Sequence, residues 1–251
     1  MILTPIPHIN GPYCHLYSFG DTHIGSADCD EKLLQRDIQA VSQDPFARVI
    51  LNGDILQCDY TGSVGDVYYQ KYPPSKQEQL AEEWFEPIQD KIIGILDGNH
   101  CGRTKEDNRP CQRIARHLKV NYLQDEGLFK LSVGARPNNG KPFVYTVFVV
   151  HGWSSGRTMG AKANTLKGLG DVVNASVYVI NHTHQILSFP TAIYMPDLRN
   201  NKVEKVERHF VNAGSWQERG HYPQRKAFAP QVLGTPQIIL SGTEKKVNVL
   251  S

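Results

Sequence analysis

Five apolar segments of this chain are each followed immediately by Asp, Asn or His side chains. The segments are short and continuous, as buried strands are. The five pairs are His15–Phe19 with Asp21 and His23, Arg48–Leu51 with Asn52 and Asp54, Ile92–Leu96 with Asn99 and His100, Phe143–Val150 with His151, and Val177–Ile180 with Asn181, His182 and His184. Loops at the carboxyl ends of strands converge on the ligand site of an open α/β sheet. We therefore expect these polar groups to meet at one place.

Strand and helix patterns alternate in the first half of the chain, which favours a layered sheet with parallel strands. The helices expected there are Glu31–Val41 and Lys76–Gln89, and the chain becomes richer in strands after about Asn121. The further elements expected in the second half are a helix at Ala161–Leu169 and strands at Ile186–Phe189, Val203–Val211, Gln237–Ser241 and Val247–Leu250. This order predicts an α/β protein with two mixed sheets packed face to face, helices outside, and one domain over residues 1–251.

Composition excludes several classes of protein. Of the 251 residues, 40% are hydrophobic and 21% charged, which is typical of a globular chain and not of a disordered one. The formal net charge of +2 gives no argument for nucleic-acid binding from bulk charge. The five cysteines form no C-x-x-C pair, which indicates a reducing compartment without a zinc knuckle.

We also expect no signal peptide and no membrane span. The segment 1–5 lacks a basic region, and no apolar run approaches the roughly 18 residues that a spanning helix needs. The expected location is the cytoplasm, without membrane attachment, and the oligomeric state is left open.

The residue types after the five segments form a set of metal ligands. Carboxylate and amide oxygens combined with imidazoles suit Mn²⁺, Fe²⁺, Zn²⁺, Co²⁺ or Ni²⁺. There are too many for one tetrahedral ion, and Asp54 stands centrally in the order. We expect two divalent ions roughly 3.5–4 Å apart, bridged by one carboxylate and one water or hydroxide. Asp21 and His23, two residues apart, would face one side of a regular strand.

At these residues the sequence resembles the calcineurin-like metallophosphoesterase superfamily, whose ordered pattern is D-x-H, G-D, G-N-H, H and G-H-x-H. The resemblance spans roughly residues 15–215, and 212–215 is similar to the N-x-G-S turn of that family. It implies a four-layered α/β/β/α sandwich. It implies one ion, Mn²⁺ by preference, held by Asp21, His23, Asp54 and His184, and a second held by Asp54, Asn99, His151 and His182.

Two positions depart from the family pattern. Asn181 stands where the family usually has Gly before H-x-H. Because Asn tolerates left-handed backbone better than other residues with a side chain, we expect the turn to survive. Cys101 stands where a carboxylate usually follows G-N-H, and that carboxylate orients the histidine and raises its basicity. We therefore expect a smaller protonated fraction of His100 near pH 7.

A hydroxide formed between the two ions would attack phosphorus in line, and His100 would protonate or hydrogen-bond the leaving oxygen. Arg103 and Arg157 each follow a metal-site motif closely, and we expect them to contact phosphate. Four tyrosines lie in the segment after Asp54, and they either stack nucleobases or pack on the domain or a second subunit. They are Tyr60, Tyr68, Tyr69 and Tyr72.

These observations favour a phosphodiesterase or nuclease acting on DNA, another nucleic acid or a nucleotide. A phosphomonoesterase is the alternative among enzymes, and a non-enzymatic scaffold is the alternative outside them. The scaffold predicts missing ligands, whereas all seven ligand positions here carry competent residues. The spacing G-N-H-x-x-R and the run from Gly156 to Lys162 look, more loosely, like phage or prophage members, which would place the protein in a host cytoplasm.

Overall fold

Two six-stranded mixed sheets, each hydrogen-bonded as one unit, form the centre of the computed structural model, which describes residues 1–251 except 63–64, 104–108, 154–155 and 226. The first sheet has the order β1 (Leu3–Pro5), β6 (Glu126–Val133), β7 (Phe143–Val150), β8 (Val177–Ile180), β10 (Lys202–Ala213) and β9 (Ile186–Asp197). The second has the order β12 (Val247–Leu250), β11 (Gln237–Ser241), β2 (Tyr13–Phe19), β3 (Ala47–Asn52), β4 (Ile92–Leu96) and β5 (Tyr122–Gln124).

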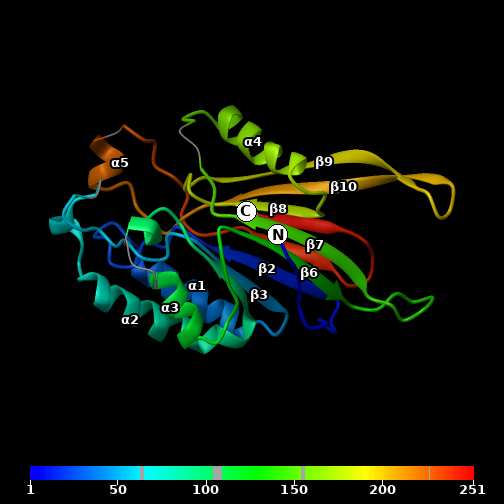
Figure 1. Ribbon diagram of the computed structural model, residues 1–251, viewed down its shortest axis with the longest axis horizontal. Helices are drawn as coiled ribbons and strands as arrows, with labels where there is room; N and C mark the ends of the chain where they lie inside the picture. The colour runs from blue at the N-terminus through cyan, green and yellow to red at the C-terminus, as the bar shows by residue number, and fades with distance from the viewer. Residues whose placement is uncertain (63–64, 104–108, 154–155, 226) are drawn as a thin grey trace.

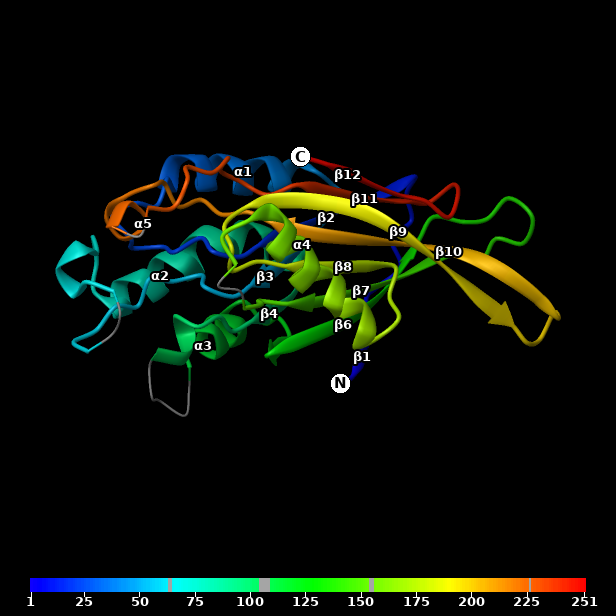
Figure 2. The ribbon, with the colours of Figure 1, turned by 90° about the horizontal axis from the view of Figure 1, so that it is seen from above.

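Helices cover the outer faces of both sheets, so the predicted four-layered α/β/β/α sandwich is confirmed (Figures 1 and 2). The helices are α1 (Glu31–Gln43), α2 (Pro74–Phe85), α3 (Pro110–His117), α4 (Met159–Gly168) and α5 (His221–Arg225). The first three pack on the second sheet, and α4 packs on the first. In α1, Asp30 caps the first turn, and Leu34, Ile38 and Val41 recur at helical spacing on its buried side.

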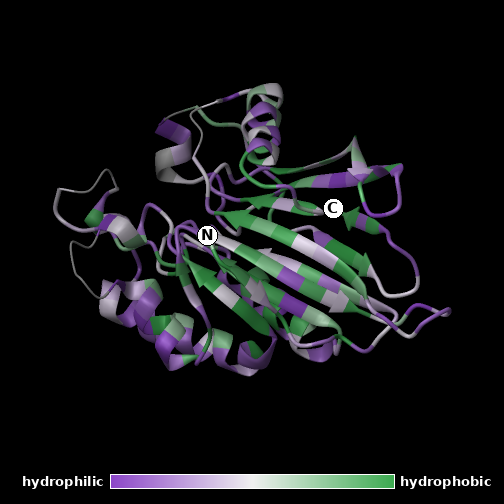
Figure 3. Ribbon diagram, turned by 45° about the vertical axis from the view of Figure 1, so that its right-hand side comes forward, coloured by the Kyte–Doolittle hydropathy of each residue, from purple (hydrophilic) through white to green (hydrophobic). Residues whose placement is uncertain are grey.

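The main apolar core lies between the two sheets. Leu16 and Ile50 of the second sheet pack there against Val147, Val179 and Val211 of the first. Figure 3 shows hydrophobic residues along the strands and a mixture of hydrophilic and hydrophobic residues along the outer helices.

Parallel pairing brings the carboxyl ends of the motif-bearing strands to a common edge in each sheet. Strands β2, β3, β4 and β5 are mutually parallel in that order, and β7, β8 and β10 are parallel in the other sheet. The predicted convergence of the five polar segments therefore follows from the topology.

A buried polar link joins the two sheets at this edge. The side-chain oxygen of Asn181, which follows β8, accepts hydrogen bonds from Ser18 Oγ of β2 and Asn52 Nδ2 of β3, both at 2.8 Å. Asn52 Nδ2 also donates to the main-chain oxygen of Val150 in β7, at 3.0 Å. Asn52 and Asn181 are fully buried, so these hydrogen bonds fix the distance between the sheets where the loops begin.

Asn181 does not have the left-handed backbone that the sequence suggested for it. Asn181 is absent from the positive-φ residues among those described, and the left-handed conformations fall instead on His182 (φ 66°) and His184 (φ 57°). Its side chain occupies the space beside Gly20, where a Cβ would lie 2.6 Å from the Asn181 side chain. The amide is thus an inter-sheet link, and Gly20 leaves room for it.

Strand β9 is longer than the sequence predicts, and β1, β5 and β6 are not predicted. β9 continues to Asp197 through Pro190 and Pro196, because it is an edge strand, where a missing main-chain donor is tolerated. With β10 it forms the long hairpin that projects in Figure 2. β6 was not predicted, because Glu126, Gly127 and Lys130 interrupt its apolar residues. Among the described residues no helix is long and apolar enough to cross a membrane.

Replacing Asn181 by Ala should lower the free energy of unfolding by about 3 kcal/mol, because Ser18 and Gly214 lose buried partners. Thermal and urea unfolding would measure this loss. Asn248→Ala, at an exposed position of β12, is the matched control and should change stability by less than about 0.5 kcal/mol. Equal effects of the two substitutions would contradict the inter-sheet link.

Candidate metal centre

Two groups of ligand atoms converge at the common edge. One consists of Asp21, His23 and His184, and the other of Asp54, His151 and His182. In the first, Asp21 Oδ1 lies 3.4 Å from His184 Nε2 and 3.7 Å from His23 Nε2. In the second, Asp54 Oδ2 lies 3.1 Å from His151 Nε2.

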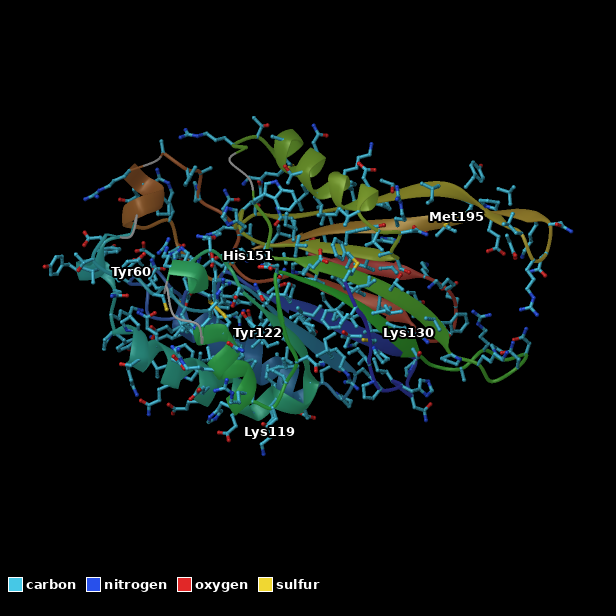
Figure 4. All side chains as sticks on the ribbon, in the orientation of Figure 1. Tyr60, Lys119, Tyr122, Lys130, His151 and Met195 are labelled. Atoms are coloured by element: carbon cyan, nitrogen blue, oxygen red, sulfur yellow. A yellow bond between two sulfur atoms is a disulfide. The ribbon has the colours of Figure 1, made fainter. Side chains whose placement is uncertain are left out.

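Asn99 joins the second group, since its Oδ1 lies 3.0 Å from His182 Nδ1. Asp21 Oδ1 also lies 3.9 Å from His151 Nε2, so the two groups adjoin. The seven residues singled out as ligands therefore lie in one place, and His100 adjoins them through His23 and Asp54. Figure 4 shows His151 at the loop end of the sheets, well away from Met195 on the projecting hairpin.

Left-handed backbone orients most of these side chains. Five residues of the centre have positive φ: Asp21, His23, Asp54, His182 and His184. Residues with side chains rarely adopt this conformation, and where it occurs it tends to cluster at functional sites. The expectation that Asp21 and His23 lie on a regular strand is wrong, because β2 ends at Phe19 and both residues follow in left-handed turns.

Each carboxylate uses one oxygen to fix its position and turns the other toward the centre. Asp21 Oδ2 accepts from the main-chain N–H of His182 at 2.6 Å, and Asp54 Oδ1 accepts from that of His100 at 2.8 Å. A Cβ at Gly98 would lie 2.1 Å from Asp54 Oδ1, so the glycine of G-N-H is needed for this approach.

The histidines are held in the same manner. His151 Nδ1 donates to the main-chain oxygen of Asn52 at 2.8 Å, and His23 Nδ1 donates to Gln57 Oε1 at 3.0 Å. Both rings therefore turn Nε2 toward the centre, where a bound cation would take the place of a proton.

These donor atoms fit divalent cations. His23 Nε2 and His184 Nε2 face each other at 3.3 Å, and within the described part of the chain the buried atoms Asp21 Oδ1 and His151 Nε2 make no hydrogen bond. Buried polar atoms are almost always satisfied, and a cation would satisfy all of these. Oxygen and imidazole donors favour divalent ions of the Mn²⁺ to Zn²⁺ series.

Charge within the centre shifts the pKa of several groups. Burial alone would raise the pKa of Asp21 and Asp54, but the neighbouring histidines outweigh burial and hold both pKa values well below the usual range. Burial lowers the pKa of His151, yet Asp54 and Asp21 outweigh it and raise the pKa to about 9. For His100, burial and His23 lower the pKa to about 3.

The two predicted phosphate contacts lie in different surroundings. Arg103 is largely buried and lies against His100, with Nη2 2.8 Å from His100 Nε2. Arg157 is exposed, and its guanidinium stacks 5.5 Å from the centre of the Phe228 ring. Of the two, the structure brings Arg103 to the centre.

Sequence reasoning missed the residues that support the ligands. Gln57, three residues after Asp54, holds His23, and Ser215 Oγ donates to the main-chain oxygen of Asp21 at 2.7 Å. The position of Gln57 directly after the G-D motif was a usable signal. Ser215 lies in the segment similar to the N-x-G-S turn, but its bond joins residues 194 apart in sequence, so the sequence did not show that it supports Asp21.

The cysteines also differ from the expectation. Cys101 and Cys111 form a disulfide with Cα atoms 6.5 Å apart, whereas Cys14, Cys29 and Cys58 are buried thiols. The expectation of reduced cysteines throughout is therefore wrong for one pair. The partners lie 10 residues apart in sequence, and Cys111 is in the first turn of α3.

Comparisons with known proteins concern the fold. No family model and no curated protein matches the chain. Similar solved structures include vacuolar protein sorting 29 of Cryptosporidium parvum (14% identity, 95% of this chain and 96% of that one, TM-score 0.46) and a metallophosphoesterase of Sphaerobacter thermophilus (14%, 95% and 87%, 0.40). A third is the Entamoeba histolytica protein Vps29 complexed with Zn²⁺ (11%, 94% and 96%, 0.41).

These similarities concern the fold of the chain alone. Because these TM-scores lie below 0.5, we base its function on its own residues.

The charge on His151 predicts how stability varies with pH. The pKa of His151 is about 9 in the metal-free folded protein, which is higher than in the unfolded chain. Protonated His151 therefore stabilises the folded state fully below about pH 6.5, and this stabilisation disappears as pH rises through 9. With metal bound, the cation takes the place of the proton. Tm should therefore fall from pH 6.5 to 8.5 in EDTA and fall less in excess Mn²⁺.

His117→Asn, at a half-exposed histidine on α3, is the control and should keep the difference between EDTA and Mn²⁺. If Tm falls equally with rising pH in EDTA and in excess Mn²⁺, the result would contradict a cation beside His151.

Proposed function

We propose that this protein is a dinuclear-metal phosphoric ester hydrolase that cleaves phosphodiesters in nucleic acids or nucleotides. One observation carries the proposal: two groups of Asp and His ligands share an edge, with Asp21 Oδ1 and Asp54 Oδ2 both turned toward His151 Nε2. Two adjoining divalent ions suit phosphoryl transfer, and Mn²⁺ is our first choice, with Fe, Zn, Ni and Co as alternatives.

When bound, the ions would supply positive charge to phosphate oxygens and lower the pKa of a coordinated water toward neutrality. The chain itself fixes the ligands. Asp21, His23, Asp54 and His184 would hold one ion, and Asp54, Asn99, His151 and His182 would hold the other. Hydrogen bonds from outside the centre set the orientation of His23 and His151, so little reorganisation accompanies binding.

His100 is our candidate for the group at the leaving oxygen. Its ring lies 4.5 Å from that of His23, and its Nε2 lies 4.0 Å from Asp54 Oδ2. Its Nδ1–H donates to the main-chain oxygen of Gln57 at 2.7 Å, which orients the ring without the carboxylate that Cys101 replaces. Arg103 and the more distant Arg157 are the proposed phosphate contacts.

Exposed aromatic residues on the loops around the centre support a nucleotide or nucleic-acid substrate. Tyr68 is 94% exposed and Tyr60 39% exposed on the loop after Asp54, and Trp153, two residues after His151, is 61% exposed. Figure 4 shows Tyr60 far out on this loop. Aromatic rings at such positions stack on bases with little sequence preference. The likeness to phage members remains a prediction.

A phosphomonoesterase and a non-enzymatic scaffold are the alternatives. The same metal ligands can support monoester hydrolysis, so the residues that line the substrate site decide whether a monoester or a diester is cleaved. A scaffold does not need ligands, and the convergence of seven competent residues favours an enzyme.

Hydrolysis of bis-p-nitrophenyl phosphate with Mn²⁺ tests the proposal. The wild type should cleave this diester faster than p-nitrophenyl phosphate, and Asp54→Ala should lose both metal and turnover, because Asp54 adjoins both groups. His100→Ala should keep the metal and lose about 10²–10⁴-fold in turnover.

Asp90→Ala, at an exposed position beside the amino end of β4, is the control and should leave turnover unchanged. Cleavage of the monoester alone would replace the diesterase by a phosphatase. A protein that binds metal and cleaves neither ester would favour the scaffold.

A further inference from the structure

A closed ring of hydrogen bonds surrounds His100. Gln57 contributes to it twice, because its main-chain oxygen accepts from His100 Nδ1 and its side-chain Nε2 donates to Asp59 Oδ2 at 2.7 Å. Arg103 closes the ring, with Nη1 donating to Asp59 Oδ1 and Nη2 donating to His100 Nε2. Gln57 also holds His23, so the ring is attached to a metal ligand.

The ring fixes the roles of both nitrogens of His100. The carbonyl oxygen of Gln57 can only accept, so Nδ1 carries the proton, and a guanidinium can only donate, so Nε2 is the acceptor. In this arrangement His100 Nε2 carries no proton, so it can serve the leaving oxygen only after Arg103 Nη2 has left it and it has taken up a proton. The cationic donor closest to that nitrogen is Arg103.

The surroundings of Asp59 hold its carboxylate in position against Arg103. Its side chain is 3% exposed, and that of Arg103 is 17% exposed, so the pair is screened from water. The main chain of Asp59 is fixed by Gln70, whose side-chain amide donates to the Asp59 carbonyl at 3.0 Å and accepts from its N–H at 3.3 Å. A Cβ at Gly65 would lie 2.0 Å from Asp59 Oδ1, so the tyrosine-bearing loop lies directly on this carboxylate.

We propose that Asp59 is a positioning residue that holds Arg103 as the phosphate-binding cation of the centre; this rests on the proposed function. A phosphate oxygen is a stronger acceptor than an imidazole nitrogen and would compete for Nη2, while Nη1 stays on Asp59. The geometric fork of arginine is required, because one lysine ammonium cannot replace two separate guanidinium nitrogens. Cys101 supplies no carboxylate to orient the His100 ring. The Asp59–Arg103 pair offers another way to hold that ring in position.

Binding of inorganic phosphate to the Mn²⁺-loaded protein, measured by calorimetry, tests this assignment. Arg103→Ala and Asp59→Asn should each raise the Kd for phosphate about tenfold or more. The double variant should bind no more weakly than Arg103→Ala, because Asp59 is assigned to phosphate binding through Arg103, and asparagine at position 59 can still accept from Gln57 Nε2. Arg103→Lys should lose as much affinity as Arg103→Ala, and this arm does not depend on Asp59→Asn folding.

Glu78→Gln is the matched control. Glu78 accepts from Arg113 Nε and Nη2, both at 2.7 Å, in a carboxylate–guanidinium pair between α2 and α3, so its loss should leave phosphate affinity unchanged. With a diester substrate, Asp59→Asn should raise KM more than it lowers kcat, because a phosphate contact is made in the ground state as well.

Three results would overturn the assignment: full affinity in Arg103→Lys, additive losses in the double variant, or a wild type that binds no phosphate. Its failure is distinguishable from failure of the proposed function. If the protein hydrolyses esters but the losses of phosphate affinity in the two single variants add in the double variant, only the role of Asp59 is contradicted. If these losses do not add and no ester is hydrolysed, only the hydrolase is contradicted.

Discussion

The amide of Asn181 is the interaction on which the rest of the structure depends. Two packed sheets can slide and rotate about an apolar interface, because apolar contacts have little direction. A buried amide that bonds Ser18 and Asn52 at once allows one arrangement. Since the ligands follow these same strands within a few residues, the link that fixes the sheets also sets the distance between the two ligand groups.

The metal ligands have strained backbone, and hydrogen bonds from other parts of the chain stabilise it. Asp21, His23 and Asp54 follow strand ends in left-handed conformations, which cost conformational energy at each position. The cost is offset by bonds to parts of the chain far away in sequence, such as the bond from the His182 N–H to Asp21 Oδ2. A centre of this kind is already shaped for cations before they bind, which is what electrostatic catalysis requires.

The sequence predicts the strands that are fully buried and the ligands that follow them. β4, β7 and β8 have the predicted bounds, because continuous apolar runs leave little choice, and the partly buried strands β11 and β12 have them as well. β6 was not predicted because its apolar residues alternate with Glu126 and Lys130. The extension of β9 past Pro190 was not predicted because no sequence pattern reveals which strand will be at an edge.

Within the centre, the residue types of the ligands were predictable and their geometry was not. Spacing along the chain suggested that Asp21 and His23 share a strand face, yet left-handed turns bring them together. Asn181 looked like a substitute for glycine in a turn because its partners, Ser18 and Asn52, lie 163 and 129 residues away. Arg103 stands in the spacing G-N-H-x-x-R, whereas Asp59 belongs to no motif, so only its proximity relates Asp59 to His100.

Electron paramagnetic resonance of the Mn²⁺-titrated protein tests the central claim, that one chain holds two adjoining cations at these ligands. The account predicts binding of two equivalents and, at the second, an exchange-coupled signal from ions roughly 3.5–4 Å apart. A single equivalent, or two equivalents that give only the uncoupled six-line spectrum, would contradict it.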